Sequence, residues 1–158
     1  MSECIPAPVR SGPSLESLAS LVVDGAYQLY RALGPSLRES VYERLLAHDL
    51  GRCGLTVHRQ HPINFQYAGL SFVGGFRADL LINETLLVEV KSVELMSAVH
   101  VKQTLTYLRL MDRPLGLLLN FGAPRFRDAV RRVVNNHVPL ADSPLRIHRA
   151  RDGDGDAR

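Results

Sequence analysis

Three charged residues stand in two short stretches of the chain that are otherwise mostly apolar. Asp79 lies within residues 77–82, and Glu89 and Lys91 lie within residues 86–91. Moving an ionised carboxylate out of water is costly unless the carboxylate is paired or binds a metal. Two acids and a lysine in such surroundings therefore indicate a site that performs chemistry.

The loop between the two stretches decides whether the acids meet. Side chains of a β-strand alternate between its faces, so Glu89 and Lys91 share one face of the second strand. A three-residue loop at residues 83–85 places Asp79 opposite Glu89, whereas a two-residue loop places the two acids on different faces. The three-residue loop also gathers the apolar residues Ala78, Leu80, Ile82, Leu86, Val88 and Val90. We therefore expect a hairpin that carries a two-carboxylate cluster with a lysine beside it.

Such a cluster suits a hard divalent cation. Mg²⁺ prefers carboxylate oxygens, keeps several waters and is usually completed by substrate phosphate. A neighbouring lysine can hold the attacking water and offset charge that develops on phosphorus. The alternative is a surface hairpin with an ordinary ion pair, because structural ion pairs also produce such clusters.

These residues resemble the PD-(D/E)xK nuclease superfamily, with Asp79 as the first acid and residues 89–91 as the E-x-K element. Within that superfamily the chain is similar to the GxxExxY family of small bacterial and archaeal proteins, over about residues 20–136. The similarity rests on residues 34–43, Gln60, residues 67–69, 78–81 and 88–91, His100, Gln103, Tyr107, Leu108 and residues 117–122. One departure is visible, since Ser36 stands where the family motif has its glycine.

The resemblance implies a restriction-endonuclease-like α/β core, with a mixed central β-sheet flanked by α-helices. It also implies a metal-dependent nuclease that hydrolyses phosphodiester bonds, in DNA more than in RNA. Mg²⁺ or Mn²⁺ would be held by Asp79, Glu89, the Val90 carbonyl and Glu39. Lys91 would lie beside the attacking water, and Gln103 would orient water, lysine or substrate phosphate.

Glu39 has a second interpretation. Residues 36–39 also read as a capping box, in which Ser36 caps a helix and Glu39 reaches back to the serine amide. One carboxylate cannot fill both roles at once. Tyr42, one turn further along, is expected to pack in the interior with its hydroxyl bonded to a neighbour.

A helix over residues 97–111 would place His100, Gln103 and Tyr107 on one face. Tyr107 is expected to support Gln103 or to contact the nucleic-acid backbone. For His100 the simpler interpretation is a satisfied polar residue rather than a catalytic one.

The remaining pattern predicts one α/β domain over residues 14–140, with flexible tails at 1–13 and 141–158. Apolar spacing predicts helices at 14–33 and 37–50. Strands are expected at 55–60, 63–67, 76–82, 86–92 and 115–121, with turns at 68–69 and 74–75 between the early ones. The segment 129–135 is strand or helix, and strand is favoured. Four arginines, at 125, 127, 131 and 132, form either a solvated face or a phosphate contact.

Composition limits the class of protein. With 158 residues and 46% hydrophobic content, the chain can bury a core without disulfides. The two cysteines resemble neither a metal knuckle nor a disulfide framework, and no signal peptide or membrane span is recognised, so we expect a cytoplasmic protein. A net charge of +3 permits nucleic-acid binding. A homodimer is possible, and the alternatives to a nuclease are a non-catalytic nucleic-acid-binding module and an oligomeric interaction subunit.

Overall fold

The computed structural model describes residues 12–136 and 147–148. Its elements follow in chain order: α1 (Leu15–Leu33), α2 (Glu39–Arg52), β1 (Val57–Tyr67), β2 (Leu70–Ile82), β3 (Leu86–Lys91), α3 (Ala98–Met111), β4 (Leu115–Asn120), the 3-10 helix η1 (Phe126–Asp128), β5 (Val130–Val134) and β6 (Ile147–His148). The strands form one sheet in the order β5-β4-β3-β2-β1-β6. Among the described strands only β3 and β4 pair in parallel, and α3 connects them.

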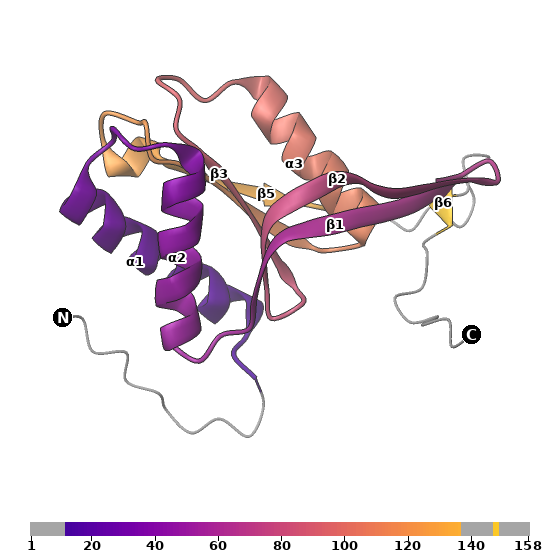
Figure 1. The fold of residues 1–158 in the computed structure, drawn as a ribbon, viewed down its shortest axis with the longest axis horizontal. Coiled ribbons are helices and arrows are strands. Elements are labelled where there is room, and N and C mark those ends of the chain that lie inside the picture. Colours follow the sequence, from indigo (N-terminus) through magenta and orange to yellow (C-terminus); the bar gives the residue numbers. More distant parts are fainter. Residues whose placement is uncertain (1–11, 137–146, 149–158) are drawn as a thin grey trace.

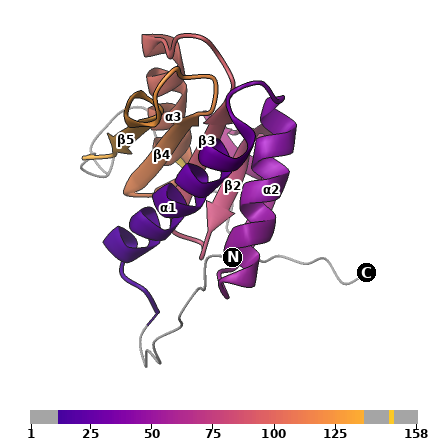
Figure 2. The same ribbon diagram turned by 90° about the vertical axis from the view of Figure 1, so that its left-hand side faces the viewer.

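Helices cover both faces of the sheet. Figure 2 shows α1 and α2 on one side of the strands and α3 on the other. Apolar residues recur along α1 at helical spacing, and Leu18, Val22, Ala26 and Leu29 are buried. They pack with Leu86, Val88 and Val90 of β3 in the larger of two cores. The expected α/β fold, a mixed sheet flanked by helices, is confirmed.

The strands β1 and β2 form one long hairpin that extends beyond the helices (Figure 1). The sequence analysis expected interruptions at residues 68–69 and 74–75, and only the first is a turn. At the second, Gly74 adopts a φ of 62° and its N–H donates to Asn64 Oδ1 at 2.7 Å, so a bulge is absorbed without ending the strand. The register shifts between Ile63 and Phe65 for the same reason. We call the projecting part of the hairpin, residues 63–76, the arm.

The hairpin bends where β1 and β2 leave the main sheet. Leu80 and Ile82 lie in the core under α1 and α2, whereas Ala78 lies in the smaller core with Tyr107 of α3. The expectation that these three residues share one apolar face is therefore wrong for Ala78. Gln60, which lies level with Asp79 on the neighbouring strand, has a φ of 50°. Positive φ is uncommon for a residue with a side chain and recurs at functional sites.

Other parts of the sequence analysis are refined by the structure. The segment near residue 130 is a strand, as favoured, and α2 begins at Glu39 rather than at residue 37. The residues Ile147 and His148 pair with the tip of β1, within a range assigned to a tail; so short a strand leaves no periodic pattern in the sequence. Most of the two expected tails, and the end of the expected domain, lie outside the described residues.

Cys53 follows α2 and is disulfide-bonded, while Cys4 lies outside the described residues. The sequence analysis expected no disulfide, because spacing along the chain does not reveal which residues a fold brings together. In the described part of the chain, no helix combines the length and the apolar character needed to cross a bilayer.

Candidate active site

The hairpin between β2 and β3 has the predicted register. Leu80 pairs with Val88 and Ile82 with Leu86, so residues 83–85 form a three-residue loop. Asn83 and Glu84 in this loop both adopt positive φ, which the tight connection requires. The same register carries Asp79 to the position opposite Glu89.

Beyond the last backbone pair, the side chains of the two acids bond β2 to β3 by accepting hydrogen bonds from backbone N–H groups of the opposite strand. The Asp79 N–H donates to Glu89 Oε1 at 3.2 Å, and the Val90 N–H donates to Asp79 Oδ2 at 2.9 Å. The last backbone pair of the ladder is Leu80 with Val88, immediately before the acids. Each carboxylate is therefore fixed to the main chain of the opposite strand, and the two lie together at the point where the sheet opens.

The protein environment opposes ionisation of Glu89. This side chain is only 3% exposed. Burial raises the pKa of Glu89 to about 8, and the charge of Asp79 adds to the effect, while Lys91 and the N–H of Asp79 act against it. A cation bound to the pair, or a proton on Glu89, therefore stabilises it strongly.

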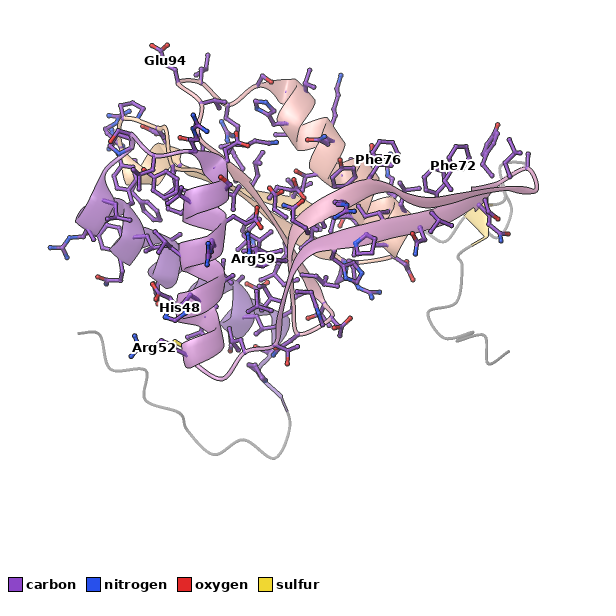
Figure 3. The ribbon with its side chains drawn as sticks, viewed as in Figure 1. His48, Arg52, Arg59, Phe72, Phe76 and Glu94 are labelled. Atoms are coloured by element: carbon purple, nitrogen blue, oxygen red, sulfur yellow. The ribbon has the colours of Figure 1, made fainter. Side chains whose placement is uncertain are left out.

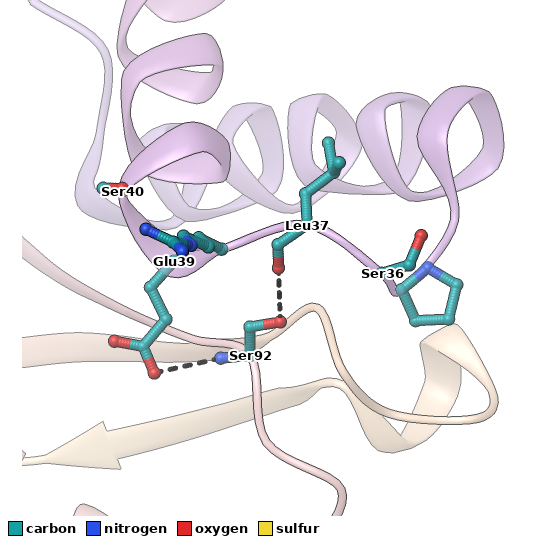
Figure 4. Close-up of a pocket in the computed structure, with 7 residues that line it drawn as sticks. Ser36, Leu37, Glu39, Ser40 and Ser92 are labelled. Atoms are coloured by element: carbon teal, nitrogen blue, oxygen red, sulfur yellow. Dashed lines mark hydrogen bonds between the residues drawn. The ribbon is translucent and has the colours of Figure 1, made fainter.

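Lys91 ends β3, and the chain that follows it is attached to the start of α2. Glu39 Oε1 accepts a hydrogen bond from the Ser92 N–H at 3.2 Å, and Ser92 Oγ donates to the Leu37 carbonyl at 2.8 Å (Figure 4). The N-cap of α2 is Arg38, which makes no side-chain cap bond, so the capping box proposed for residues 36–39 does not form. Glu39 instead joins α2 to the segment directly after Lys91.

An open depression lies over this junction (Figure 4). It has a volume of about 660 Å³ and is lined by residues 35–40 and by Ser92. Three serine hydroxyls and the Arg38 side chain belong to this lining. Glu39 lines the same hollow, so the hollow is polar and contains one positive and one negative side chain.

Glu43 is a site residue that the sequence analysis did not select. It lies on the buried face of α2 and is only 4% exposed. Gln60 Nε2 donates to Glu43 Oε2 at 2.9 Å and to Asp79 Oδ1 at 3.2 Å, so one amide joins the two carboxylates. Arg59, which Figure 3 places between α2 and the hairpin, donates from Nε to Glu43 Oε1 at 3.1 Å. Burial raises the pKa of Glu43, and Gln60 and Arg59 act against this rise while Asp79 adds to it.

A signal for Glu43 was present in the sequence. It lies on the same helical stripe as the buried residues Tyr42, Leu46, Ala47 and Leu50. A charged residue within an apolar stripe requires a partner. The same reasoning that singled out Asp79 and Glu89 in their strands applies to this helix.

Tyr42 has the packing role expected of it. Its ring stacks on Phe121 with a centroid distance of 4.2 Å and is fully buried. Its hydroxyl donates to the Gly34 carbonyl and accepts from the Leu37 N–H, the latter at 3.2 Å. The residue fixes the loop between α1 and α2, and hence the position of Glu39.

The three polar residues of α3 have different surroundings. His100 Nδ1 accepts from the Ser97 N–H at 3.2 Å, so His100 caps the helix. Gln103 Nε2 donates to Tyr107 Oη at 3.1 Å. Burial raises the pKa of Tyr107, and the nearby charge of Glu89 adds to this rise. Tyr107 is therefore near enough to the acid pair for the charges of both acids to act on it, and Gln103 is hydrogen-bonded to Tyr107.

Asn120 holds the chain that follows Lys91. Its Oδ1 accepts from the N–H groups of Val93 and Gly122, both at 3.0 Å. A Cβ on Gly122 would lie 2.4 Å from the Val93 carbonyl oxygen, so only glycine fits there. This contact explains the Asn-x-Gly spacing at the end of β4 as a structural device rather than a catalytic one.

The residues present fit a divalent cation with few protein ligands. Across residues 12–136 no group of three or more His, Cys, Asp or Glu side chains is arranged to hold a metal, so Glu39 and Glu43 do not join the acid pair in one ligand cluster. Two carboxylates are nevertheless enough for Mg²⁺, which retains waters and takes oxygens from substrate. The placement of the two carboxylates side by side, with Glu89 almost fully buried, is the observation that favours a cation here.

Two of the four arginines near β5 are held in ion pairs with residues outside this site. Arg125 pairs with Asp128 at 2.8 Å, and Arg132 pairs with Glu16 at 2.7 Å. The strand β5 is the sheet edge furthest from β1. Their surroundings favour a solvated face over a phosphate contact.

Comparison with protein families gives a match over most of the chain. A family model described as the PD-(D/E)XK nuclease superfamily matches residues 16–133. No curated protein and no solved structure matches the chain significantly. The matched range contains the acid pair, Lys91, Glu43 and α3.

Proposed function

Because the chain belongs to the PD-(D/E)XK nuclease superfamily, we propose that it is a divalent-metal-dependent nuclease that hydrolyses phosphodiester bonds, in DNA more than in RNA. The observation that carries this proposal is the pair of the half-buried Asp79 and the buried Glu89, each hydrogen-bonded to the main chain of the opposite strand, with Lys91 two residues after Glu89 on β3. A fold that holds an acid in this way loses stability unless a cation or proton is bound. The similarity to the GxxExxY family, a cytoplasmic location and a homodimer stay predictions from the sequence.

Asp79, Glu89 and the Val90 carbonyl are the proposed ligands of Mg²⁺ or Mn²⁺. When bound, such a cation lowers the pKa of water and offsets negative charge on the phosphate. In the hydrolysis, a water oxygen forms a bond to phosphorus, the bond to the leaving oxygen breaks, and that oxygen takes up a proton. Lys91 contributes positive charge beside the acid pair, where it orients the water and stabilises the charge that develops on the phosphate.

The residues around the pair act by positioning. Gln60 bonds Asp79 and Glu43 with one amide, so the Asp79 carboxylate keeps one orientation. Glu39 holds the main chain directly after Lys91 and thereby the direction of the lysine. On the α3 side, Tyr107 and Gln103 place a hydroxyl and an amide near Glu89. Positioning residues of this kind commonly change activity by about 10–100-fold.

The test is a cleavage screen of purified protein. Single- and double-stranded DNA and RNA are each incubated with Mg²⁺, Mn²⁺ or chelator, and Glu89→Gln and Lys91→Ala variants run beside the wild type. We expect cleavage that requires a metal and is lost in both variants. Cleavage that persists unchanged in the variants would contradict the mechanism. Nucleic-acid binding with a steep salt dependence but no cleavage would favour the non-catalytic binding module.

A further inference from the structure

A row of aromatic side chains runs along the arm. Phe65 stacks on Phe72 with centroids 4.7 Å apart and on Phe76 at 6.2 Å. Phe72 and Phe76 project from the same side of the arm, the side on which α3 lies (Figure 3). They remain 42% and 45% exposed, so each keeps a ring surface that no described residue covers. Phe65 also packs against the smaller core, whereas Phe72 and Phe76 keep exposed ring surfaces beside it. Exposed aromatic rings grouped in this way indicate a binding surface.

The row leads to the acid pair. Phe76 contacts Tyr107 with centroids 5.9 Å apart, and Tyr107 is close enough to Glu89 for the charge of that residue to raise its pKa. Phe76 precedes Asp79 by three positions on β2, which is about 10 Å at the rise of a strand. Bases that stack about 3.4 Å apart would cover this distance in about three nucleotides.

The elements around the row carry positive and no negative charge. Neither β1, nor β2 as far as Ala78, nor α3 contains an aspartate or glutamate. Arg77, just after the arm, and Lys102 and Arg109 on α3 are exposed. The net positive charge of these elements attracts a polyanion to this part of the molecule.

We propose that the aromatic row of the arm is a stacking platform for unpaired bases, which selects single-stranded nucleic acid, or a single-stranded segment, as the substrate. Sequence-tolerant binding of single strands combines a cationic track with aromatic rings on which bases stack. A continuous duplex cannot use Phe72 and Phe76 in this way, because its bases are stacked on each other. This inference rests on the proposed nuclease function and names its substrate class.

The binding test is done in chelator, so that no cleavage interferes. Fluorescence anisotropy with labelled single strands of about 16 nucleotides, in DNA and in RNA, is compared with the matching duplex for each variant. The Phe72→Ala/Phe76→Ala double variant removes both free rings. Val73→Ala is the matched control, because Val73 lies on the same strand and is 81% exposed but takes no part in the row. Phe76→Leu and Phe76→Trp keep the apolar contact with Tyr107, and only the tryptophan variant keeps a stacking surface.

We expect the double variant to bind single strands at least about 10–100-fold more weakly, since the loss of one stacked base alone weakens binding by about this much, and to bind duplex nearly as the wild type does. Val73→Ala and Phe76→Trp should bind as the wild type does, and Phe76→Leu should bind single strands more weakly. Equal single-strand binding by wild type and Phe76→Leu would overturn the inference, as would equal losses for single strands and duplex. A variant that changes from dimer to monomer in light scattering while it binds single strands normally would show that the arm joins two copies, and would also overturn it.

Failure of the inference and failure of the proposed function can be separated. If the wild type cuts nucleic acid and the double variant keeps the wild-type ratio of single-strand to duplex cleavage, the stacking platform is refuted and the nuclease stands. If the phenylalanine variants lose single-strand binding but the wild type cuts nothing with Mg²⁺ or Mn²⁺, the platform stands and the nuclease is refuted.

Discussion

Replacing Glu89 by glutamine removes a carboxyl whose ionisation the fold opposes. The pKa of Glu89 rises from an ordinary 4.5 to about 8 in the folded protein. Between these two values the unfolded chain ionises this residue while the folded chain keeps it protonated, so stability falls as the pH rises. Each pKa unit corresponds to about 1.4 kcal/mol, and the stability linked to this one group across the window is therefore at most about 5 kcal/mol.

Glutamine imitates the protonated acid. Its Oε1 can still accept the hydrogen bond from the Asp79 N–H, and its amide can donate to the Asp79 carboxylate. We therefore expect the Glu89→Gln variant, without metal, to match the wild type near pH 5 and to exceed its stability increasingly up to about pH 8. Above that pH the difference should be constant, because the wild-type residue is then ionised in both states.

The assay is urea unfolding followed by circular dichroism in chelator, at several pH values from 5 to 9. Taking the difference between variant and wild type cancels the other titrating groups. Glu94→Gln is the control, because Glu94 is exposed and lies just beyond β3, and it should leave the pH profile unchanged. Addition of Mg²⁺ at pH 8 should restore stability to the wild type and not to Glu89→Gln. The same pH profile for wild type and Glu89→Gln would refute the reasoning.

Three further predictions concern the surroundings of the acid pair. Glu43→Ala leaves Gln60 without its second carboxylate, so cleavage by the folded variant should slow by about 10–100-fold in single-turnover assays; an unchanged rate would remove Glu43 from the site. Gly122→Ala forces a Cβ against the Val93 carbonyl at 2.4 Å, and thermal unfolding should show a loss of about 1–3 kcal/mol. His100→Ala removes a helix cap and should cost about 1 kcal/mol with no change in the pH dependence of cleavage; a missing limb of the pH–rate profile would instead make His100 catalytic.

The meeting of Asp79 and Glu89 could be predicted from sequence because two independent constraints agree. The apolar residues of β2 and β3 and the length of their loop both require Leu80 to pair with Val88. A one-residue slip would expose a whole apolar face, so the pattern leaves little freedom. The helix α3 could be predicted from the sequence equally well, because its polar residues recur at helical spacing.

Other features of the site depend on contacts between segments that are distant in the chain. The sequence contains a weaker pattern for these features, so they were harder to predict. Whether Glu39 caps α2 or bonds Ser92 depends on where β3 ends in space, and residues 36–39 alone do not contain that information. The role of Glu43 depends on Gln60, which reaches it only because β1 bends with a positive φ. The continuity of β2 through Gly74 depends on the Asn64 side chain across the hairpin. Local propensity predicted a break there, and a cross-strand hydrogen bond prevents it.

Single-turnover cleavage of a labelled single strand by wild type and by Lys91→Met tests the central claim most directly. Methionine keeps a long unbranched side chain but removes the charge beside the acid pair. A thermal shift on addition of Mn²⁺ reports whether the metal still binds, and Lys102→Met is the control for loss of a positive charge elsewhere. We expect Lys91→Met to bind Mn²⁺ and to cut at least about 100-fold more slowly, with Lys102→Met close to the wild-type rate. Equal cleavage by wild type and Lys91→Met would contradict the assignment of this site.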